Sequence, residues 1–400
     1  MLEICKWKHD ADAPVLLMVD DLANVWVDSN RDGRVDPGED WGYARDEPYS
    51  SFRYLTERVL RDFPAVKVTF FTPVGIRASL VADSPLPRIA RPIDADAASS
   101  AFFRMIHQSP RFELAYHGTT HGRSGGDARH FQQEWLTYPD LAAAEAAIAR
   151  GKQIFRAVCG SDPAGGKYCG YRSNRFSDAS IDHSGFLWWC RYWNRGAVSE
   201  RNCAGGGPDR DPLTAFDIKY FGNRPVIDIP STLSGGLFTY REPAAGSWRS
   251  RLKSAWWDLF VWRGFRQIDA LLRHRLVISI QEHIAPARED GRRQQPNIFD
   301  DTAGLRLIFG YLRHKNVWYC TGTELAEYVW LRDRVTATRT GPGAFRLVCD
   351  AQRSLNHPEL TIRLDRTAGS RFVRTPAGEL VPLRQGLADI PFQDGEYRVV

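Results

Sequence analysis

Short apolar runs alternate with helical patterns along most of this chain, and that alternation limits the folds open to it. The expected strands are the runs 15–19, 66–71, 112–116, 225–229, 276–280 and 316–319. The expected helices lie at 50–62, 97–107, 140–158, 255–273 and 301–314. Strands that alternate with helices favour a largely parallel sheet or barrel, and in such folds the working residues gather where strands end. The sequence therefore predicts an α/β domain with a site at one edge of its sheet.

The pattern changes near residue 333. A helix that begins at Thr321-Gly322-Thr323-Glu324 runs to about 332, and no helical period follows it. Strand-like segments at 345–348, 360–364, 372–373 and 397–400 are separated by Gly, Pro and Asn turns. We expect an α/β domain over 1–333 and a small all-β domain over 334–400.

Composition indicates a globular protein and excludes several function classes. The 53 basic and 48 acidic residues give a net charge of +5, spread along the chain, so we expect no nucleic-acid partner. Neither an apolar leader nor a run of membrane-spanning length is evident, so we expect a cytoplasmic protein. Seven cysteines without a short-spaced metal motif suit free thiols in a reducing compartment. Pairing of Cys159 with Cys169 is the alternative.

Two histidines four residues apart follow the third strand-like run, in His117-Gly118-Thr119-Thr120-His121. Imidazoles at this spacing can bind one metal ion, and zinc is the natural candidate. A catalytic zinc needs three protein ligands and an open position for water. Asp20-Asp21, which ends the first run, is the expected source of the third ligand. With ten histidines in the chain, chance can supply this spacing, so the pair gains weight only from the motifs around it.

The order of these motifs resembles that of the polysaccharide deacetylase family with NodB homology. The Asp pair follows the first strand, Val68-Thr69-Phe70-Phe71 lies in the second, and the His pair follows the third. Later motifs, in order, are Gly-Tyr-Arg-Ser-Asn-Arg-Phe-Ser at 170–177, Val-Ile-Asp-Ile-Pro-Ser-Thr at 226–232, Gln-Glu-His at 281–283 and Thr-Gly-Thr-Glu-Leu at 321–325. The resemblance covers roughly 14–330 and implies a deformed (β/α) barrel, but it does not extend to 335–400.

The resemblance also implies a role for each site residue. The metal ligands would be Asp21, His117 and His121. Asp20 would be the general base, and Arg172 would pair with Asp20 and keep it ionised. Asp228 would orient the histidine that acts as the acid. The implied reaction removes an N-acetyl group from a sugar, which needs an activated water, a Lewis acid on the amide carbonyl and a proton for the departing amine.

The last strand-like run departs from the family. It has Gln281 where the relatives have a histidine, and an amide cannot serve as a general acid. His283 lies two residues later, on the same face of an extended strand, and is the expected acid. The alternative is that His283 is an ordinary rim histidine in a weakly active or inactive relative that binds carbohydrate. Ser173-Asn174 likewise replaces the Pro-rich segment that follows the family's arginine.

A second metal motif lies between the first two strands. Residues 28–39 fit the calcium-loop pattern D-x-[DN]-x-[DN]-G-x5-E. The expected ligand positions are Asp28, Asn30, Asp32, Arg34, Asp36 and Glu39. Because no flanking helices are evident, we expect a structural calcium loop inserted into the barrel. The alternative is a solvated acidic loop.

Two aromatic segments each allow two interpretations. The segment 248–266 combines tryptophan with arginine and lysine. Aromatic residues at helical spacing favour a helix packed on the barrel, and the alternative is a helix lying on an anionic membrane surface. Trp188, Trp189 and Trp193 form either a sugar-stacking wall or part of the core.

These observations predict a cytoplasmic, zinc-dependent deacetylase of the NodB-homology type that acts on an N-acylated sugar. The expected location favours a nucleotide-linked or lipid-linked intermediate of surface-polysaccharide synthesis, such as O-antigen biosynthesis, over a cell-wall polymer. Two alternatives are kept: a weak or inactive carbohydrate-binding relative, and a metal-dependent amidohydrolase on a non-sugar amide.

Overall fold

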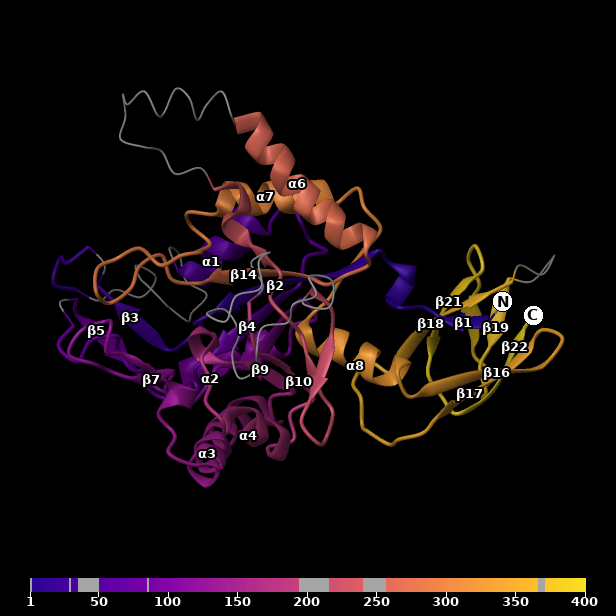
Figure 1. Ribbon diagram of the computed structural model, residues 1–400, viewed down its shortest axis with the longest axis horizontal. Coiled ribbons are helices and arrows are strands. Elements are labelled where there is room, and N and C mark those ends of the chain that lie inside the picture. Colours follow the sequence, from indigo (N-terminus) through magenta and orange to yellow (C-terminus); the bar gives the residue numbers. More distant parts are fainter. Residues whose placement is uncertain are drawn as a thin grey trace.

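The computed structural model contains an α/β body and a smaller β region (Figure 1). It describes residues 2–28, 30–34, 50–84, 86–193, 216–239, 257–365 and 371–400, with backbone alone at 257–260. No helix within these ranges is long and apolar enough to cross a membrane.

The body is built around a ten-stranded sheet in the order β11-β12-β10-β9-β6-β4-β2-β14-β13, with β15 beside β2. The strands are β2 (Ala13–Asp20), β4 (Val68–Thr72), β6 (Phe112–Tyr116), β9 (Gly165–Lys167), β10 (Trp188–Cys190), β11 (Lys219–Phe221), β12 (Val226–Asp228), β13 (Leu233–Ser234), β14 (Ile278–His283) and β15 (Val317–Tyr319). Neighbouring strands are parallel except β11 and β12. The sheet curls into an incomplete barrel, which confirms the predicted deformed (β/α) barrel.

Strand β2 occupies the middle of the sheet because its apolar run is buried along its whole length. Continuous apolar runs are typical of parallel strands that are covered on both faces. The register aligns Asp20 with His283 of β14 on one side and with Phe71 of β4 on the other. The ends of β2, β4 and β14 therefore lie at one edge of the sheet.

Helices cover the outside of the sheet (Figure 1). They are α1 (Ser51–Tyr54), α2 (Ala97–His107), α3 (Leu141–Cys159), α4 (Ser177–His183), α6 (Trp257–Arg273), α7 (Thr302–Leu312) and α8 (Gly322–Arg332). Helix α1 continues as a π turn, η2 (Leu55–Val59), so the helix expected at 50–62 is shorter and irregular. Thr321 and Glu324 form the capping box that starts α8.

Shorter elements connect the barrel. They are the strands β3 (Val25–Val27), β5 (Arg88–Ala90), β7 (Gly122–Arg123) and β8 (Gln132–Gln133), and the 3-10 turns η1 (Lys8–Asp10), η3 (Glu134–Leu136), η4 (Cys169–Tyr171) and η7 (Gly235–Phe238).

The β region contains two antiparallel sheets. One has the order β16-β17-β22-β19-β20 and the other the order β1-β18-β21. Their strands are β1 (Leu2–Ile4), β16 (Val335–Gly341), β17 (Ala344–Cys349), β18 (Glu359–Leu364), β19 (Phe372–Arg374), β20 (Leu380–Pro382), β21 (Leu387–Pro391) and β22 (Gly395–Val399). Strand β1 pairs with β18, so the β region includes the N-terminal strand as well as residues from 335 onward.

Buried tryptophans form part of the core. Trp188 and Trp189 are both 0% exposed, so neither can stack on a sugar, and Trp193 alone of the three lines a cavity. The cysteines among the described residues, including Cys159 and Cys169, are free thiols, so the alternative of a disulfide between these two is wrong.

Helix α6 has one apolar face that packs on the core and one exposed face that carries aromatic and basic side chains. Phe265 and Val261 pack against the core, while Trp262 is 54% exposed and carries the Arg266 guanidinium over its ring. Residues 248–256 lie outside the described residues. The membrane interpretation therefore stays a prediction.

Candidate metal centre

Three of the predicted site residues converge at the edge of the sheet. Asp21 follows β2, while His117 and His121 follow β6. The Oδ1 atom of Asp21 lies 3.2 Å from Nε2 of His121 and 3.8 Å from Nε2 of His117. All three side chains are buried. The structure thus brings together the predicted metal ligands.

The protonation of these groups fits a cation site. The Nδ1 atom of His117 lies 3.0 Å from the carbonyl oxygen of Lys167 and must donate to it, which leaves the lone pair of Nε2 facing Asp21. Burial lowers the pKa of His117, and lowers that of His121 well below its usual range, so both imidazoles are neutral. Oδ1 of Asp21 is buried and accepts no hydrogen bond from the described residues. Such an arrangement of acceptors is costly without a cation between them.

Asp21 is ionised because of a buried arginine. Burial alone would raise the pKa of Asp21, but the charge of Arg77 outweighs it and holds that pKa well below its usual range. Arg77 donates from Nη2 to Oδ2 of Asp21 at 3.2 Å and from Nη1 to Glu289 at 2.9 Å. Because Arg77 occupies Oδ2, the other carboxylate oxygen is left for the metal. The sequence offers no signal for Arg77, which lies in the loop after β4.

The loop that carries both histidines is held by Glu134. The backbone N–H groups of Thr119, Thr120 and His121 donate to its carboxylate at 2.9, 2.8 and 2.7 Å. The loop is tight, since Gly118 has φ +84° and a Cβ there would lie 2.3 Å from Glu134 Oε2. His121 itself has φ +66°. Glu134 therefore holds the backbone of the loop and, through it, the positions of the two histidines.

Cys169 is a second candidate for the third ligand. Its ligand atom and those of His117 and His121 lie within 4.8 Å of one another. It donates its S–H to the His117 carbonyl at 3.1 Å, and burial raises its pKa well above the usual range. It is thus a neutral thiol that supports the loop, and Asp21, already ionised, is the better ligand.

Asp20 pairs with Lys167, and the prediction that it pairs with Arg172 is wrong. Lys167 ends β9, is 0% exposed, and donates from Nζ to Asp20 Oδ1 at 2.8 Å and to Gln281 Oε1. Its ammonium group lies over the rings of Phe71 and Tyr171. The turn η4 separates Lys167 from Arg172, whose side chain is exposed to solvent. The cation beside Asp20 is therefore a lysine at the end of β9 and not the predicted arginine.

His283 reaches the site as predicted, on the same face of β14 as Gln281. Its Nε2 atom lies 4.0 Å from Asp20 Oδ2, and its Nδ1 donates to the Pro296 carbonyl at 2.8 Å. Gln281 is fully buried and accepts from Lys167 and from the Tyr171 hydroxyl. Gln281 therefore holds Lys167, and His283 faces Asp20.

Asp228 does not orient His283, so that prediction is wrong. It is buried at the end of β12 and accepts from Nε of Arg191 at 2.8 Å. Burial raises the pKa of Asp228, although Arg191 opposes that shift. The Pro296 carbonyl takes the orienting role expected of Asp228.

Half of the predicted calcium loop is described. Asp28 accepts from the backbone N–H groups of Arg31 and Gly33 at 2.6 and 3.0 Å, and Asp32 accepts from that of Arg34 at 2.9 Å. Asn30 accepts from the N–H of Asp32. Asp36 and Glu39 lie outside the described residues. Calcium binding stays a prediction.

Comparisons with known proteins give fold-level likenesses. No family model matches the chain, and no curated protein matches it. Among solved structures it is similar to a putative polysaccharide deacetylase from Mycobacterium smegmatis (17% identity, 85% of this chain and 98% of that chain, TM-score 0.46). It is similar to a probable polysaccharide deacetylase from Pseudomonas aeruginosa PAO1 (15%, 82% and 93%, 0.44) and to Puue allantoinase (15%, 80% and 91%, 0.39). These TM-scores are below 0.5, so the function depends on the side chains of the site.

Proposed function

We propose that this protein is a metal-dependent deacetylase that removes an N-acetyl or related acyl group from a sugar. The observation that carries the proposal is the convergence of Asp21 Oδ1 with Nε2 of His117 and Nε2 of His121. A second carboxylate, that of Asp20, lies beside them. Two neutral imidazoles and one carboxylate are a ligand set that suits Zn²⁺ and other divalent transition metals. A structural zinc site would have four protein ligands and no acid or base beside it.

The roles divide between the two aspartates. Asp21, His117 and His121 would hold the ion. When bound, a divalent ion there supplies a Lewis acid for the amide carbonyl and lowers the pKa of the attacking water. Asp20 accepts the proton of that water, with Lys167 balancing its charge at 2.8 Å. His283, 4.0 Å from Asp20 and fixed by Pro296, donates a proton to the departing amine.

The place of His283 supports an enzyme over a relative that only binds carbohydrate. One ring nitrogen of His283 faces Asp20 while the other donates to a carbonyl, and a positioned proton donor needs such a fixed ring. The free thiols among the described cysteines agree with the cytoplasmic location expected from the sequence. We propose an intermediate of surface-polysaccharide synthesis as the substrate.

The test combines metal analysis with acetate release. We expect about one divalent metal ion per purified chain. Wild-type protein should release acetate from N-acetyl sugars, and Asp20→Asn should lower the rate about 10²-fold to 10⁴-fold while it retains the metal. The control is Asp83→Asn, which changes an exposed aspartate. Equal rates for wild type and Asp20→Asn would remove Asp20 as the base, and a metal-free, inactive wild type would overturn the proposal.

A further inference from the structure

The segment that follows β14 forms a hairpin at the metal centre. In this segment, residues 286–294 (the β14 hairpin), antiparallel hydrogen bonds join the two arms. Its tip carries Glu289, which contacts the loop after β4 through Arg77. Strand β2 lies between β14 and β4 in the sheet, so the hairpin spans the strand end that Asp21 follows.

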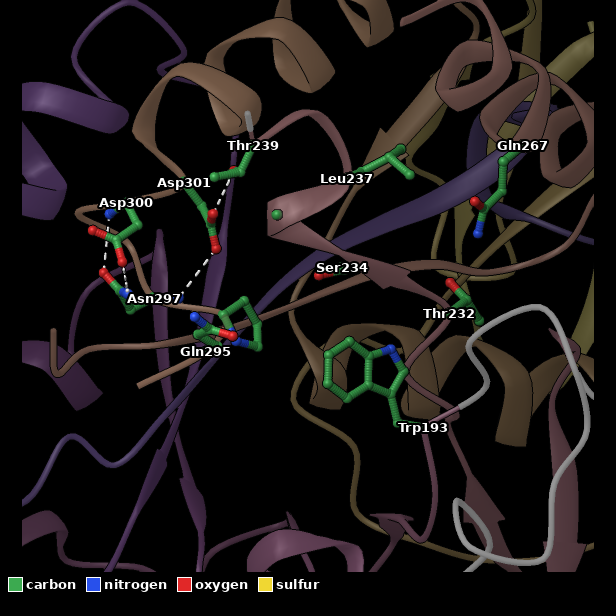
Figure 2. A pocket seen from close by; sticks show the side chains of 12 residues that line it. Trp193, Thr232, Ser234, Leu237, Thr239, Gln267, Gln295, Asn297, Asp300 and Asp301 are labelled. Atoms are coloured by element: carbon green, nitrogen blue, oxygen red, sulfur yellow. Dashed lines mark hydrogen bonds between the residues drawn. The ribbon is translucent and has the colours of Figure 1, made fainter. Parts of the chain in front are cut away.

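The foot of the hairpin is fixed on the barrel by Asn297. Its side-chain amide donates to Asp300 at 2.8 Å, and its backbone N–H donates to Asp301 at 3.1 Å. Figure 2 shows these contacts of Asn297 with the two aspartates. Pro296, in the same stretch, accepts the hydrogen bond of His283. The foot of the hairpin thus also holds the proposed acid.

Glu289 at the tip begins a chain of buried ion pairs that ends on a predicted metal ligand. Its side chain is 0% exposed, and its Oε1 accepts from Nη1 of Arg77 at 2.9 Å. Nη2 of the same guanidinium donates to Oδ2 of Asp21 at 3.2 Å. The Arg77 side chain is 4% exposed, so water screens these pairs little. Because a buried charge needs its partners, the position of Arg77 depends on Glu289 as well as on Asp21.

A second arginine makes the charge of Glu289 necessary. Nη2 of Arg88 lies 3.9 Å from Glu289 Oε1 and donates to the Arg77 carbonyl at 2.8 Å. The carboxylates of Asp21 and Glu289 thus balance two guanidinium groups. Without Glu289, Asp21 alone would face both, and the excess positive charge would oppose the binding of a divalent cation.

We infer that Glu289 is a positioning residue of the metal centre, which acts through Arg77 on the ligand Asp21. The β14 hairpin then completes the centre, because it supplies the partner of Arg77 at its tip and holds the acid at its foot. The inference rests on the proposed function for the identity of the ligands, but it concerns metal affinity and not acetate release.

The test is a double-mutant cycle on the full-length protein, with Zn²⁺ affinity measured by competition with a chelating dye. Glu289→Gln keeps an acceptor for Arg77 but removes the charge, and should weaken Zn²⁺ binding by about 10-fold. In an Arg77→Met background the same change should alter the affinity by less than about twofold, because the contact is already lost. Asp290→Asn is the control, since Asp290 pairs with Arg288 inside the hairpin, and it should bind Zn²⁺ as wild type does.

Reciprocal linkage gives a second readout, which a merely structural role would not change. If the hairpin strengthens metal binding, the metal must stabilise the hairpin by the same factor. Arg292 is exposed and offers trypsin a cleavage site in the hairpin. Zn²⁺ should slow cleavage there, identified by mass spectrometry, by about 10-fold in wild type and Asp290→Asn, but little in Glu289→Gln. A structural role alone would change the cleavage rate equally with and without the metal.

Equal Zn²⁺ affinities of Glu289→Gln and Asp290→Asn would overturn the inference. A further loss of affinity when Glu289→Gln is added to Arg77→Met would overturn it as well, and this comparison still decides if Glu289→Gln alone fails to fold. The deacetylase proposal fails separately. If wild type binds Zn²⁺ and shows this coupling but releases no acetate, that proposal is lost and the role of Glu289 stands.

Discussion

Two buried cations stand next to the paired aspartates, and each comes from a part of the chain with no motif around it. Arg77 holds Asp21 and Lys167 holds Asp20. Asp20, Asp21, His117, His121 and His283 could be found from sequence because they follow apolar runs in a fixed order. Arg77, Lys167 and Glu134 could not, because their partners are fixed only by the tertiary fold. The errors at Arg172 and Asp228 have the same origin.

The first prediction concerns Arg77. Its replacement by methionine keeps the length of the side chain but leaves Asp21 without the partner on Oδ2, so Asp21 should rotate and be ionised less readily. We expect Arg77→Met to weaken Zn²⁺ binding by about 10-fold to 100-fold, as is typical when a group that orients a metal ligand is removed. Competition with a chelating dye measures the affinity. Arg129→Met, at an exposed ion pair with Asp127, is the control, and the same affinity in both variants would contradict the role given to Arg77.

The second prediction concerns His283. His283 donates its hydrogen bond to the Pro296 carbonyl and not to a predicted metal ligand, so His283→Asn should keep the metal. The variant should lower the rate of acetate release by about 10²-fold to 10⁴-fold. The alkaline limb of the pH–rate profile, which a proton donor produces, should also disappear. His274→Asn, at an exposed histidine after α6, controls for nonspecific effects. An unchanged profile would mean that another group donates the proton.

At the scale of elements, strands with apolar, β-branched runs were found from sequence and β9 was not. Gly165-Gly166-Lys167 has little tendency to form a strand. The two glycines are required by packing, since a Cβ at Gly165 would lie 2.1 Å from the Trp188 ring and one at Gly166 would lie 2.4 Å from that of Trp189. Missing this strand is why Lys167 was missed, because it is β9 that brings its side chain into the barrel.

The third prediction belongs to the junction of β4, β6 and α8. Glu113 of β6 accepts hydrogen bonds from Thr69 and Thr323, and burial raises its pKa from 4.5 to about 7. The folded state thus binds the proton more tightly than the unfolded state does. Its contribution to stability is complete below about pH 4.5 and is lost as the pH rises through about 7.

Replacing Glu113 with glutamine should remove that part of the pH dependence. The free energy of unfolding of Glu113→Gln should fall less between pH 5 and pH 8 than that of wild type, as measured by urea unfolding of the metal-free protein. The exposed Glu379→Gln should behave as wild type. An equal fall in Glu113→Gln and in wild type would show that this carboxyl is ionised in the folded state over this pH range.

At the scale of the whole molecule, the barrel and the β region share one core. Side chains of β2, α8 and β18 belong to a single buried cluster, which includes Met18, Leu325 and Ile362. The sequence predicts a change of architecture near residue 333, because periodicity reports local structure, and strands follow α8 in the described residues. Strand β1 was not expected in the β region, because a three-residue strand has no recognisable period and its partner is at the other end of the chain.

The fourth prediction follows from that shared core. A chain of residues 1–333 would expose the apolar side of α8 and leave β1 without β18, so we expect it to aggregate, whereas the full chain stays soluble. Size-exclusion chromatography after identical expression measures the difference. The matched control is the full chain with Leu380→Ser, which changes an exposed apolar side chain of the same region. A monomeric, folded 1–333 would show that the barrel is stable by itself.

The pairing of Leu2 with Leu364 also bears on how the protein is made. Strand β1 is translated before its partner β18, and the strands and helices of the barrel lie between the two in the sequence. Until β18 has been made, β1 lacks the strand that it pairs with. A chain whose synthesis stops before β18 therefore has an unpaired strand edge at β1, with which other chains can pair.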